Sequence, residues 1–522
     1  MKIRDMIVES CALVELKSST ASEAIGELVD ALAQSGRMKD AGQCLQDVLA
    51  RERRGPTGVA SGVAIPHALT ASVRQPLLAV GRHAAGVDFR AADGQPARLV
   101  LLLAGPRGLE SLHVKILGRL ARILATGDVA SRLLDASGPR DALAAFEQAA
   151  DDLGEMPPPH DHPSVCVAGA GAGGLAMAAH LSLLGCRVAV YNRSSPRIDQ
   201  ILELGGIHVE GELEGFARIE RASTDPAEAL QGADVVMVVV PATGHCEMAR
   251  RLGPHLADGQ IVVLNPGRTG GALEFVATLR QGACASRPVV AEAETLLYAC
   301  REANPASVRI FAVKNAVPLA ALPAYLTPDV LAVVTRVLPQ FTAGDNVLRT
   351  GLSNIGSIFH PALTLLNAAW IEERHGDFEY YHEGASRSVA RVLERLDAER
   401  VAVASALGMG VRSAREWLYF AYGAPGKDLY EAIQANVGYD GIRSPNTLQH
   451  RYITEDVPAS LVPMASLGEQ LGVPVPTMKA VIHLASTVHG CDYMAEGRTV
   501  AKLGLAGLTV RDIRRLVLEG PP

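Results

Sequence analysis

The chain has 522 residues, of which 48% are apolar and 20% charged, and its formal net charge at pH 7 is −7. This length predicts two to four domains, and the composition is that of a globular protein, which excludes a largely disordered chain. The negative charge offers no basic surface for nucleic acid or an anionic membrane, so neither is expected as a partner.

The eight cysteines stand singly, without a C-x-x-C pair, a pattern typical of buried thiols in a reducing compartment. The N-terminus meets Glu9 before any long apolar run, which is unlike a signal peptide. The most apolar stretches, 99–104 and 235–242, are shorter than the about 18 residues that a membrane span needs. We therefore expect a soluble, cytoplasmic protein.

Before residue 151 the pattern is mixed α/β: residues 20–35 predict an amphipathic helix and 98–104 a buried strand. Residues 151–163 contain four prolines and a glycine, which predicts an extended linker. The triplet His160-Asp161-His162 within it could suggest a metal site. No second ligand cluster accompanies it, so no bound metal is expected.

After the linker, the pattern predicts short buried strands and then helices. The predicted strands span 165–168, 187–191, 235–241 and 261–264. From about residue 346, long helical patterns such as 384–407 take over. The sequence thus predicts an α/β multidomain chain, with domains at 1–150, 164–345 and 346–522, the last of them mainly helical.

Two histidines distinguish the N-terminal part. His67 ends a Gly-Val-Ala-Ile-Pro-His run that starts at Gly62, and His113 opens a helical pattern, with Arg51 upstream of both. This set suits a phosphohistidine site, because imidazole is nucleophilic near neutral pH and a guanidinium can neutralise a phosphoryl group. From the residues alone, two surface histidines remain the simpler interpretation.

Residues 1–150 resemble the fructose/mannitol-type IIA domain of the bacterial sugar phosphotransferase system (PTS EIIA type 2), whose signature is this histidine-containing run. The resemblance implies an α/β sandwich in which His67 accepts a phosphoryl group from the histidine-containing phosphocarrier protein. It implies further that His113 is the second active-site histidine and that Arg51 binds the phosphate. The sugar-binding IIB and IIC parts are missing from the sequence, so we expect regulation by phosphohistidine rather than sugar uptake.

A glycine-rich turn follows the first strand after the linker. Gly169, Gly171 and Gly174 fill the pattern G-x-G-x-x-G between the strand at 165–168 and a helical run, and a second strand follows at 187–191. In that context the glycines allow a tight turn and let a pyrophosphate approach the helix N-terminus. Residues 164–345 are therefore predicted to form a Rossmann domain with a doubly wound parallel sheet that binds NAD(P).

The residues after the second strand, Asn192 and Arg193, bear on the choice of cofactor. An acidic side chain there would favour NAD, whereas an arginine beside Ser194 and Ser195 better accommodates a 2′-phosphate. We therefore expect NADP in preference to NAD. The alternative is that Arg193 is a solvated loop charge.

Two polar groups stand out in the C-terminal part. His360 precedes Pro361 at a predicted helix start, and residues 450–456 bring several charged side chains together in an otherwise apolar region. Taken alone, His360 is explained equally well as a hydrogen-bonded histidine at a helix cap.

Residues 164–522 resemble the octopine/nopaline dehydrogenase family of oxidoreductases. The matching segments are Ala291–Tyr298, Asn354–Pro361, Leu396–Arg400, His450–Asp456, Gly490–Tyr493 and Gly497–Arg498. The resemblance implies an opine dehydrogenase that condenses an amino acid with a 2-oxo acid and reduces the product with NAD(P)H, or runs the reverse oxidation. It also implies that His360 is the catalytic histidine, Asp456 its carboxylate partner and Arg451 the anchor of a substrate carboxylate. Asp397 and Arg400, at i, i+3 spacing, are expected to be a structural pair.

Two alternatives remain open. A 2-hydroxy acid or ketopantoate-reductase-like dehydrogenase has the same layout but typically uses a lysine or another acid. A phosphorylation-state sensor with a non-catalytic Rossmann module would also explain the fusion. If the enzyme is active, phosphorylation of His67 is expected to gate it. The sequence specifies neither substrate nor the direction of the reaction, and a homodimer is compatible with it.

Overall fold

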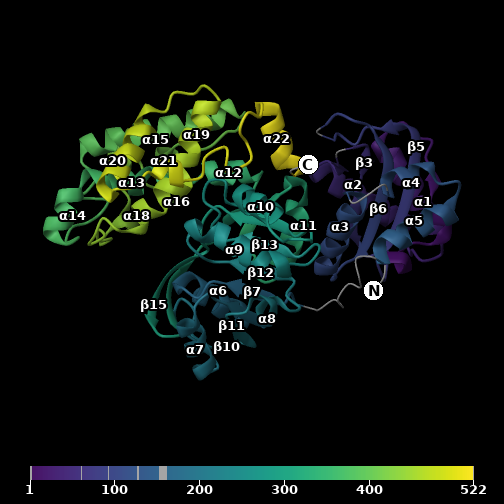
Figure 1. Ribbon diagram of the computed structural model, residues 1–522, viewed down its shortest axis with the longest axis horizontal. Helices are drawn as coiled ribbons and strands as arrows, with labels where there is room; N and C mark the ends of the chain where they lie inside the picture. The colour runs from purple at the N-terminus through teal and green to yellow at the C-terminus, as the bar shows by residue number, and fades with distance from the viewer. Residues whose placement is uncertain (1–2, 60, 92, 126–128, 152–161, 521–522) are drawn as a thin grey trace.

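The computed structural model describes residues 3–59, 61–91, 93–125, 129–151 and 162–520. Most of the predicted linker, with His160 and Asp161, lies outside the described residues. The N-terminal domain, a central Rossmann domain and a helical domain follow one another in space as in sequence, and the Rossmann domain contacts both others (Figure 1). Within the described residues, no helix is both long enough and apolar enough to cross a membrane.

The N-terminal domain contains a six-stranded sheet in the order β1-β5-β6-β3-β2, with β4 also pairing with β6. Its elements are η1 (Ile3–Met6), η2 (Glu9–Cys11), β1 (Val14–Glu15), α1 (Ala21–Gln34), α2 (Ala41–Arg54), β2 (Gly58–Val59), β3 (Val63–Ala64), β4 (His67–Thr70), β5 (Leu77–Val87), β6 (Ala97–Pro106), α3 (Glu110–Ala125), α4 (Val129–Asp135) and α5 (Pro139–Asp151). The predicted helix at 20–35 and strand at 98–104 are confirmed as α1 and β6.

Strand β6 explains how this sheet forms a sandwich. Leu99, Leu101 and Leu103 belong to the core on the side of α3, α4 and α5, whereas Val100 and Leu102 belong to the core beneath α1 and α2. A strand covered on both faces has no polar face, so it appears in the sequence as a continuous apolar run.

The Rossmann domain has an eight-stranded sheet in the order β11-β8-β7-β12-β13-β14-β17-β18, parallel except where β17 runs antiparallel to β14. Its strands are β7 (Val165–Ala168), β8 (Val188–Tyr191), β11 (Arg221–Ser223), β12 (Val235–Val238), β13 (Ile261–Leu264), β14 (Val289–Ala293), β17 (Val317–Leu322) and β18 (Phe341–Ala343). Its helices are α6 (Ala172–Leu183), α7 (Ser195–Leu204), α8 (Pro226–Leu230), η3 (Ala242–Gly244), α9 (His245–Leu252), η4 (Gly253–His255), α10 (Gly271–Gln281), η5 (Ala324–Leu326) and α11 (Thr327–Val334). The four predicted strands are confirmed, with β8 beginning at Val188 and β12 ending at Val238.

A second, four-stranded sheet packs on α6 and was not predicted. Its order is β10-β9-β16-β15, formed by β9 (Gly206–Gly211), β10 (Gly215–Arg218), β15 (Tyr298–Asn304) and β16 (Ser307–Val313). Strands from two separate parts of the domain therefore meet on one helix.

The C-terminal domain is helical, and its apolar core is continuous with one face of the Rossmann sheet. Its elements are α12 (Val347–Leu352), α13 (Gly356–Leu366), α14 (Ala368–Arg374), α15 (Arg387–Ala406), α16 (Ala414–Tyr422), α17 (Leu429–Gln434), η6 (Val437–Tyr439), α18 (Arg451–Thr454), η7 (Val457–Leu461), α19 (Val462–Gln470), α20 (Pro476–His489), α21 (Tyr493–Glu496) and α22 (Val510–Glu519). The pattern at 384–407 is confirmed as α15, where Asp397 and the fully buried Arg400 form the predicted pair.

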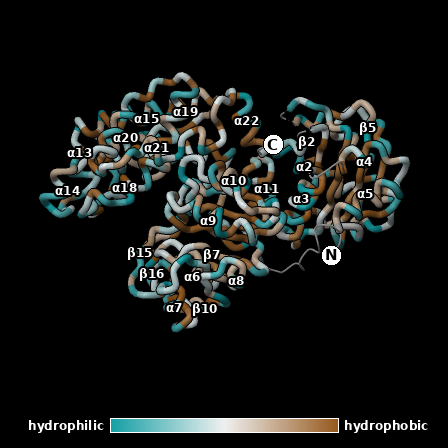
Figure 2. Tube along the Cα trace, viewed as in Figure 1, coloured by the Kyte–Doolittle hydropathy of each residue, from teal (hydrophilic) through white to brown (hydrophobic). Residues whose placement is uncertain are grey.

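The other face of the Rossmann sheet shares a core cluster with the N-terminal domain. Hydrophobic residues gather along the strands and the helices that cover them (Figure 2). Helix α3 lies beside α11, so the N-terminal domain is packed against the dehydrogenase-like part.

Candidate functional sites

His360 and Asp456 meet between two elements of the helical domain, although they are 96 residues apart. His360 lies on α13, and its Nδ1 is 2.7 Å from Oδ2 of Asp456, which lies between α18 and η7. The predicted helix start at His360 is wrong, because α13 begins at Gly356 and contains Pro361. Burial of the apolar residues around His360 outweighs the preference of proline for the first helical turn.

The carboxylate of Asp456 is held ionised. The side chain is fully buried, which by itself raises the pKa. The charge of Arg268 and the hydrogen bond from His360 outweigh burial, so the pKa lies below its usual value. An ionised carboxylate only accepts, so Nδ1 of His360 carries a hydrogen, and in the neutral ring Nε2 has the free lone pair.

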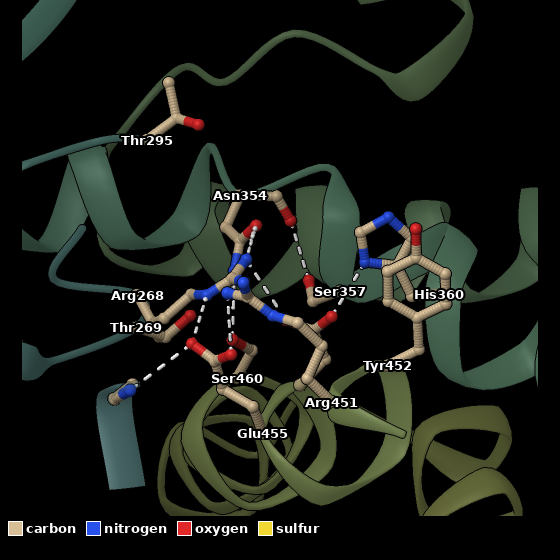
Figure 3. Close-up of polar contacts among 12 residues, drawn as sticks. Arg268, Thr269, Thr295, Asn354, Ser357, His360, Arg451, Tyr452, Glu455 and Ser460 are labelled. Carbon is tan, nitrogen blue, oxygen red and sulfur yellow. Dashed lines mark hydrogen bonds and ion pairs between the residues drawn. The ribbon is translucent and has the colours of Figure 1, made fainter. Parts of the chain in front are cut away.

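The ring of Tyr452 lies against His360 (Figure 3). The ring centroids are 4.0 Å apart and the ring planes differ by 16°. The hydroxyl of Tyr380 donates to the backbone carbonyl of His360 at 2.9 Å. Side-chain and backbone contacts therefore both fix the orientation of the imidazole.

Arg268 completes this site and was not predicted. Its Nη1 lies 3.1 Å from Oδ1 of Asp456, and its Nε lies 3.2 Å from Oε1 of Glu455. The residue has a φ of 58°, a left-handed conformation that is uncommon for a side chain other than glycine. Arg268 follows strand β13. Ala242 follows strand β12, and its backbone N–H donates to Glu455. The site thus lies at the carboxyl ends of the parallel strands, where ligands of such sheets bind.

Arg451, the predicted anchor of a substrate carboxylate, belongs to the same group of side chains (Figure 3). Its Nη2 is 2.8 Å from Oε2 of the buried Glu455, and about half of its side chain is exposed. Two arginines, Arg268 and Arg451, therefore share Glu455.

The three glycines of the turn between β7 and α6 differ in the space around them. A Cβ at Gly174 would lie 1.8 Å from the carbonyl oxygen of Gly169, and Gly169 itself has a φ of 121°. Gly171, just before α6, faces open space, with no atom within 4 Å of the position of a Cβ. The first and third glycines are required by the fold, whereas the second leaves room for a pyrophosphate at the helix N-terminus.

Asn192 and Arg193 lie beside this turn. The side-chain oxygen of Asn192 accepts from the N–H of Ala170 at 3.2 Å, which ties the residue to the turn. Arg193 forms an exposed ion pair with Glu247 at 2.6 Å. A 2′-phosphate would have to compete with that pair.

The predicted phosphohistidine site lies at the boundary between two domains. His67 and His113 are both buried, with ring centroids 5.6 Å apart, so the interpretation as two surface histidines is wrong. Nε2 of His67 lies 3.0 Å from Oδ2 of Asp329 on α11 of the Rossmann domain. Arg51 approaches the same oxygen at 3.2 Å.

Among the residues that the structure describes, His67, His113 and Asp329 bring their ligand atoms within 4.8 Å of one another, which is close enough to hold a metal ion. Arg51 already places a positive charge on the carboxylate oxygen that would bind the ion. The group therefore brings one carboxylate together with two histidines and an arginine.

This combination of folds and sites defines a two-domain oxidoreductase joined to a phosphohistidine-type domain. Family models agree. "NAD/NADP octopine/nopaline dehydrogenase, alpha-helical domain" matches residues 343–489, "Ketopantoate reductase PanE/ApbA" matches 165–267, and "Phosphoenolpyruvate-dependent sugar phosphotransferase system, EIIA 2" matches 6–149. The ketopantoate reductase match is confined to the Rossmann domain.

Among relatives, an opine dehydrogenase of Arthrobacter sp. (strain 1C) is 42% identical over 352 residues, which are 67% of this chain and 98% of that protein. A fructose-specific EIIA component of Haloferax volcanii is 38% identical over 123 residues, 24% of this chain and 80% of that protein. A solved octopine dehydrogenase, in complex with NADH and L-arginine, has the same fold, with a TM-score of 0.57 and 22% identity over 69% of this chain and 98% of that one.

The chain belongs to the opine dehydrogenase family and carries an N-terminal IIA domain of the fructose type.

Proposed function

We propose that the dehydrogenase part is a cytoplasmic enzyme that reductively condenses an amino acid with a 2-oxo acid, using His360 and Asp456 as its proton-transfer pair. The contact of 2.7 Å between these side chains carries the proposal. Because Asp456 fixes Nδ1 of His360 and stabilises the imidazolium, Nε2 is the nitrogen left to give and take a proton.

The chemistry requires such a group. When the amine adds to the oxo acid, the carbinolamine must lose its hydroxyl group as water to give an imine. The imidazolium of His360 donates a proton to that hydroxyl group, and Asp456 stabilises the positive charge before the donation. The turn of Gly169, Gly171 and Gly174 would hold NAD(P)H, which would supply the hydride that reduces the imine.

Arg451 and Arg268 supply positive charge beside this pair. Arg451 is the more accessible of the two, with 54% of its side chain exposed, against 12% for Arg268. We assign Arg451 to the carboxylate of the oxo acid, which a guanidinium can bind through two hydrogen bonds. Arg268 positions Asp456 and Glu455.

The reaction is tested by oxidation of NADPH and NADH with pools of amino acids and either pyruvate or 2-oxoglutarate. Oxidation that requires both an amine and an oxo acid is the expected result, with NADPH preferred if Arg193 exchanges Glu247 for a 2′-phosphate. Oxidation with the oxo acid alone would indicate a hydroxy acid dehydrogenase instead. Cofactor binding without turnover would favour the sensor alternative.

We propose for the IIA domain that His67 accepts a phosphoryl group from the phosphocarrier protein and that this modification regulates the dehydrogenase. Nδ1 of His67 lies 2.6 Å from the carbonyl oxygen of Ile65. Nδ1 must therefore be the donor, which leaves Nε2 as the nucleophile, on the side of Arg51. Kinetic constants of the phosphorylated protein and of His67→Ala should differ; equal constants would contradict regulation.

A further inference from the structure

The nucleophilic nitrogen of His67 is covered by another domain of the same chain. Only 1% of the His67 side chain is exposed, and Asp329 of α11 lies against its Nε2. Arg51, on α2, contacts the same carboxylate oxygen and also donates to the backbone carbonyl of Tyr325 at 2.7 Å. A carboxylate of the Rossmann domain thus occupies the position that a phosphoryl group on Nε2 would need.

The hydrogen bonds at this contact require a second proton on His67. Nδ1 donates to a carbonyl, and Nε2 faces a carboxylate that only accepts. Burial raises the pKa of Asp329, but the charges of His67 and Arg51 outweigh it and hold the pKa well below its usual value. The docked ring is therefore an imidazolium with no lone pair on Nε2, so it cannot attack phosphorus.

Two further titratable side chains, His113 and Tyr325, lie close to the imidazolium. His113, on α3, is neutral because burial and the charge of His67 lower its pKa to about 3. Tyr325, on η5, is protonated because burial raises the pKa of its hydroxyl to about 12. The positive charges of His67 and Arg51 therefore face the negative charge of Asp329.

Helix α3 extends this contact beyond the histidine. Ion pairs join it to the Rossmann domain, among them Lys115 with Asp234, Arg122 with Asp258 at 2.9 Å, and Glu110 with Arg336 at 2.8 Å.

At the centre of this contact the two backbones touch. A Cβ at Gly118 of α3 would lie 2.5 Å from the Cα of Gly259, just before β13. At this point the interface leaves no space for one more methyl group.

We propose that the face of the IIA domain around His67 is a shared docking surface, on which α11 of the dehydrogenase and the phosphocarrier protein bind in turn and exclude each other. The inference rests on the proposed role of His67 as phosphoryl acceptor. Phosphorylation then requires that the IIA domain leave α11.

The transfer step shows why the two partners exclude each other. On undocking, the proton between Nε2 and Asp329 passes to solvent, which restores the lone pair. Nε2 then forms the new N–P bond as the N–P bond on the carrier histidine breaks, and the carrier imidazole keeps the electron pair. The product carries negative charge where Asp329 lay, so repulsion between like charges keeps the phosphorylated domain undocked.

The test measures the rate at which the phosphocarrier, recharged by phosphoenolpyruvate and enzyme I, phosphorylates the full chain. Asp329→Ala removes the competing carboxylate, and Gly118→Ala separates the backbones without altering the histidine site. Because the structure shows the docked form, we expect undocking to be the limiting equilibrium, and each variant should be phosphorylated about tenfold faster than the wild type or more. Glu203→Ala removes an exposed carboxylate on α7 and should match the wild type.

The outcomes separate the inference from the proposed function. Equal rates for wild type, Asp329→Ala and Gly118→Ala, with the label on His67, would overturn mutual exclusion and leave His67 as the acceptor. Label that persists in His67→Ala, or no label on any variant, would overturn the proposed acceptor and the inference with it. Small-angle scattering adds an independent readout, because the phosphorylated wild type should have a larger radius of gyration than the unmodified protein.

Discussion

Tyr452 stacks on His360 with the two ring centroids 4.0 Å apart, and the edge of that stack faces Asp456. The imidazole is thus fixed by a ring on one face and a carboxylate on one nitrogen. A proton-transfer group fixed in this way keeps its free nitrogen pointing in one direction.

Replacement of His360 by alanine should lower kcat by about 10²- to 10⁴-fold, the usual contribution of a positioned proton donor. Cofactor affinity should remain close to that of the wild type, because the glycine turn belongs to another domain. Steady-state kinetics and NADPH fluorescence titration measure the two effects. His483→Ala, at an exposed histidine of α20, is the control; loss of cofactor binding in His360→Ala would contradict the assigned role.

Arg268→Met should change the pH profile as well as the rate. Arg268 lowers the pKa of Asp456, so without it that pKa rises and the carboxylate becomes protonated at a higher pH. The acid limb of the kcat profile should therefore move to higher pH. Arg250→Met removes an exposed arginine from α9 and should leave the profile unchanged. A lower rate with an unshifted acid limb would indicate that Arg268 has a structural role only.

Two glycines of the same turn should respond differently to alanine. At Gly174 the added methyl group overlaps the carbonyl of Gly169, which should lower the melting temperature, since overpacking costs about 1–3 kcal/mol or more. At Gly171 the methyl group meets no protein atom, so the fold should persist while NAD(P)H binding weakens. Calorimetry and cofactor titration distinguish these effects; unchanged binding in Gly171→Ala would argue against a pyrophosphate there.

Glu292 should make the protein less stable as the pH rises. Burial raises the pKa of this carboxyl group to about 7, from 4.5 for a free side chain. Between these values the folded state holds a proton that the unfolded state has lost, so the free energy of unfolding falls by up to about 1.4 kcal/mol per pH unit. Glu292→Gln should flatten this dependence between pH 5 and 7 relative to Glu203→Gln, as measured by urea denaturation at each pH; equal slopes would disprove it.

Local patterns predicted much of the fold, and long-range contacts explain the rest. Strands covered on both faces, such as β7 and β13, are evident as short apolar runs. The second sheet escaped prediction because β10 and β15 are largely exposed, and apolar runs do not mark them.

For the site, too, local motifs predicted some residues, and long-range contacts explain the others. His360 and Asp456 were found through family motifs, and the structure places them in contact, while their roles stay predictions. Arg268 and Asp329 lie in no recognised motif. Arg268 is 188 residues from its partner Asp456 along the chain, and Asp329 is 262 residues from His67. Only the folded structure brings each pair together.

Helix α22 provides a physical connection between the helical domain and the IIA domain. Its Ile513 and Val517 lie in the core that the helical and Rossmann domains share, and Gly520, just after it, lies against Pro323. Pro323 directly precedes η5, whose Tyr325 carbonyl receives Arg51 of the IIA domain. The helix therefore connects the core of the helical and Rossmann domains to η5, the segment that contacts the IIA domain. A movement of the helical domain against the Rossmann domain would therefore displace η5, and with it the carbonyl that holds Arg51 beside His67.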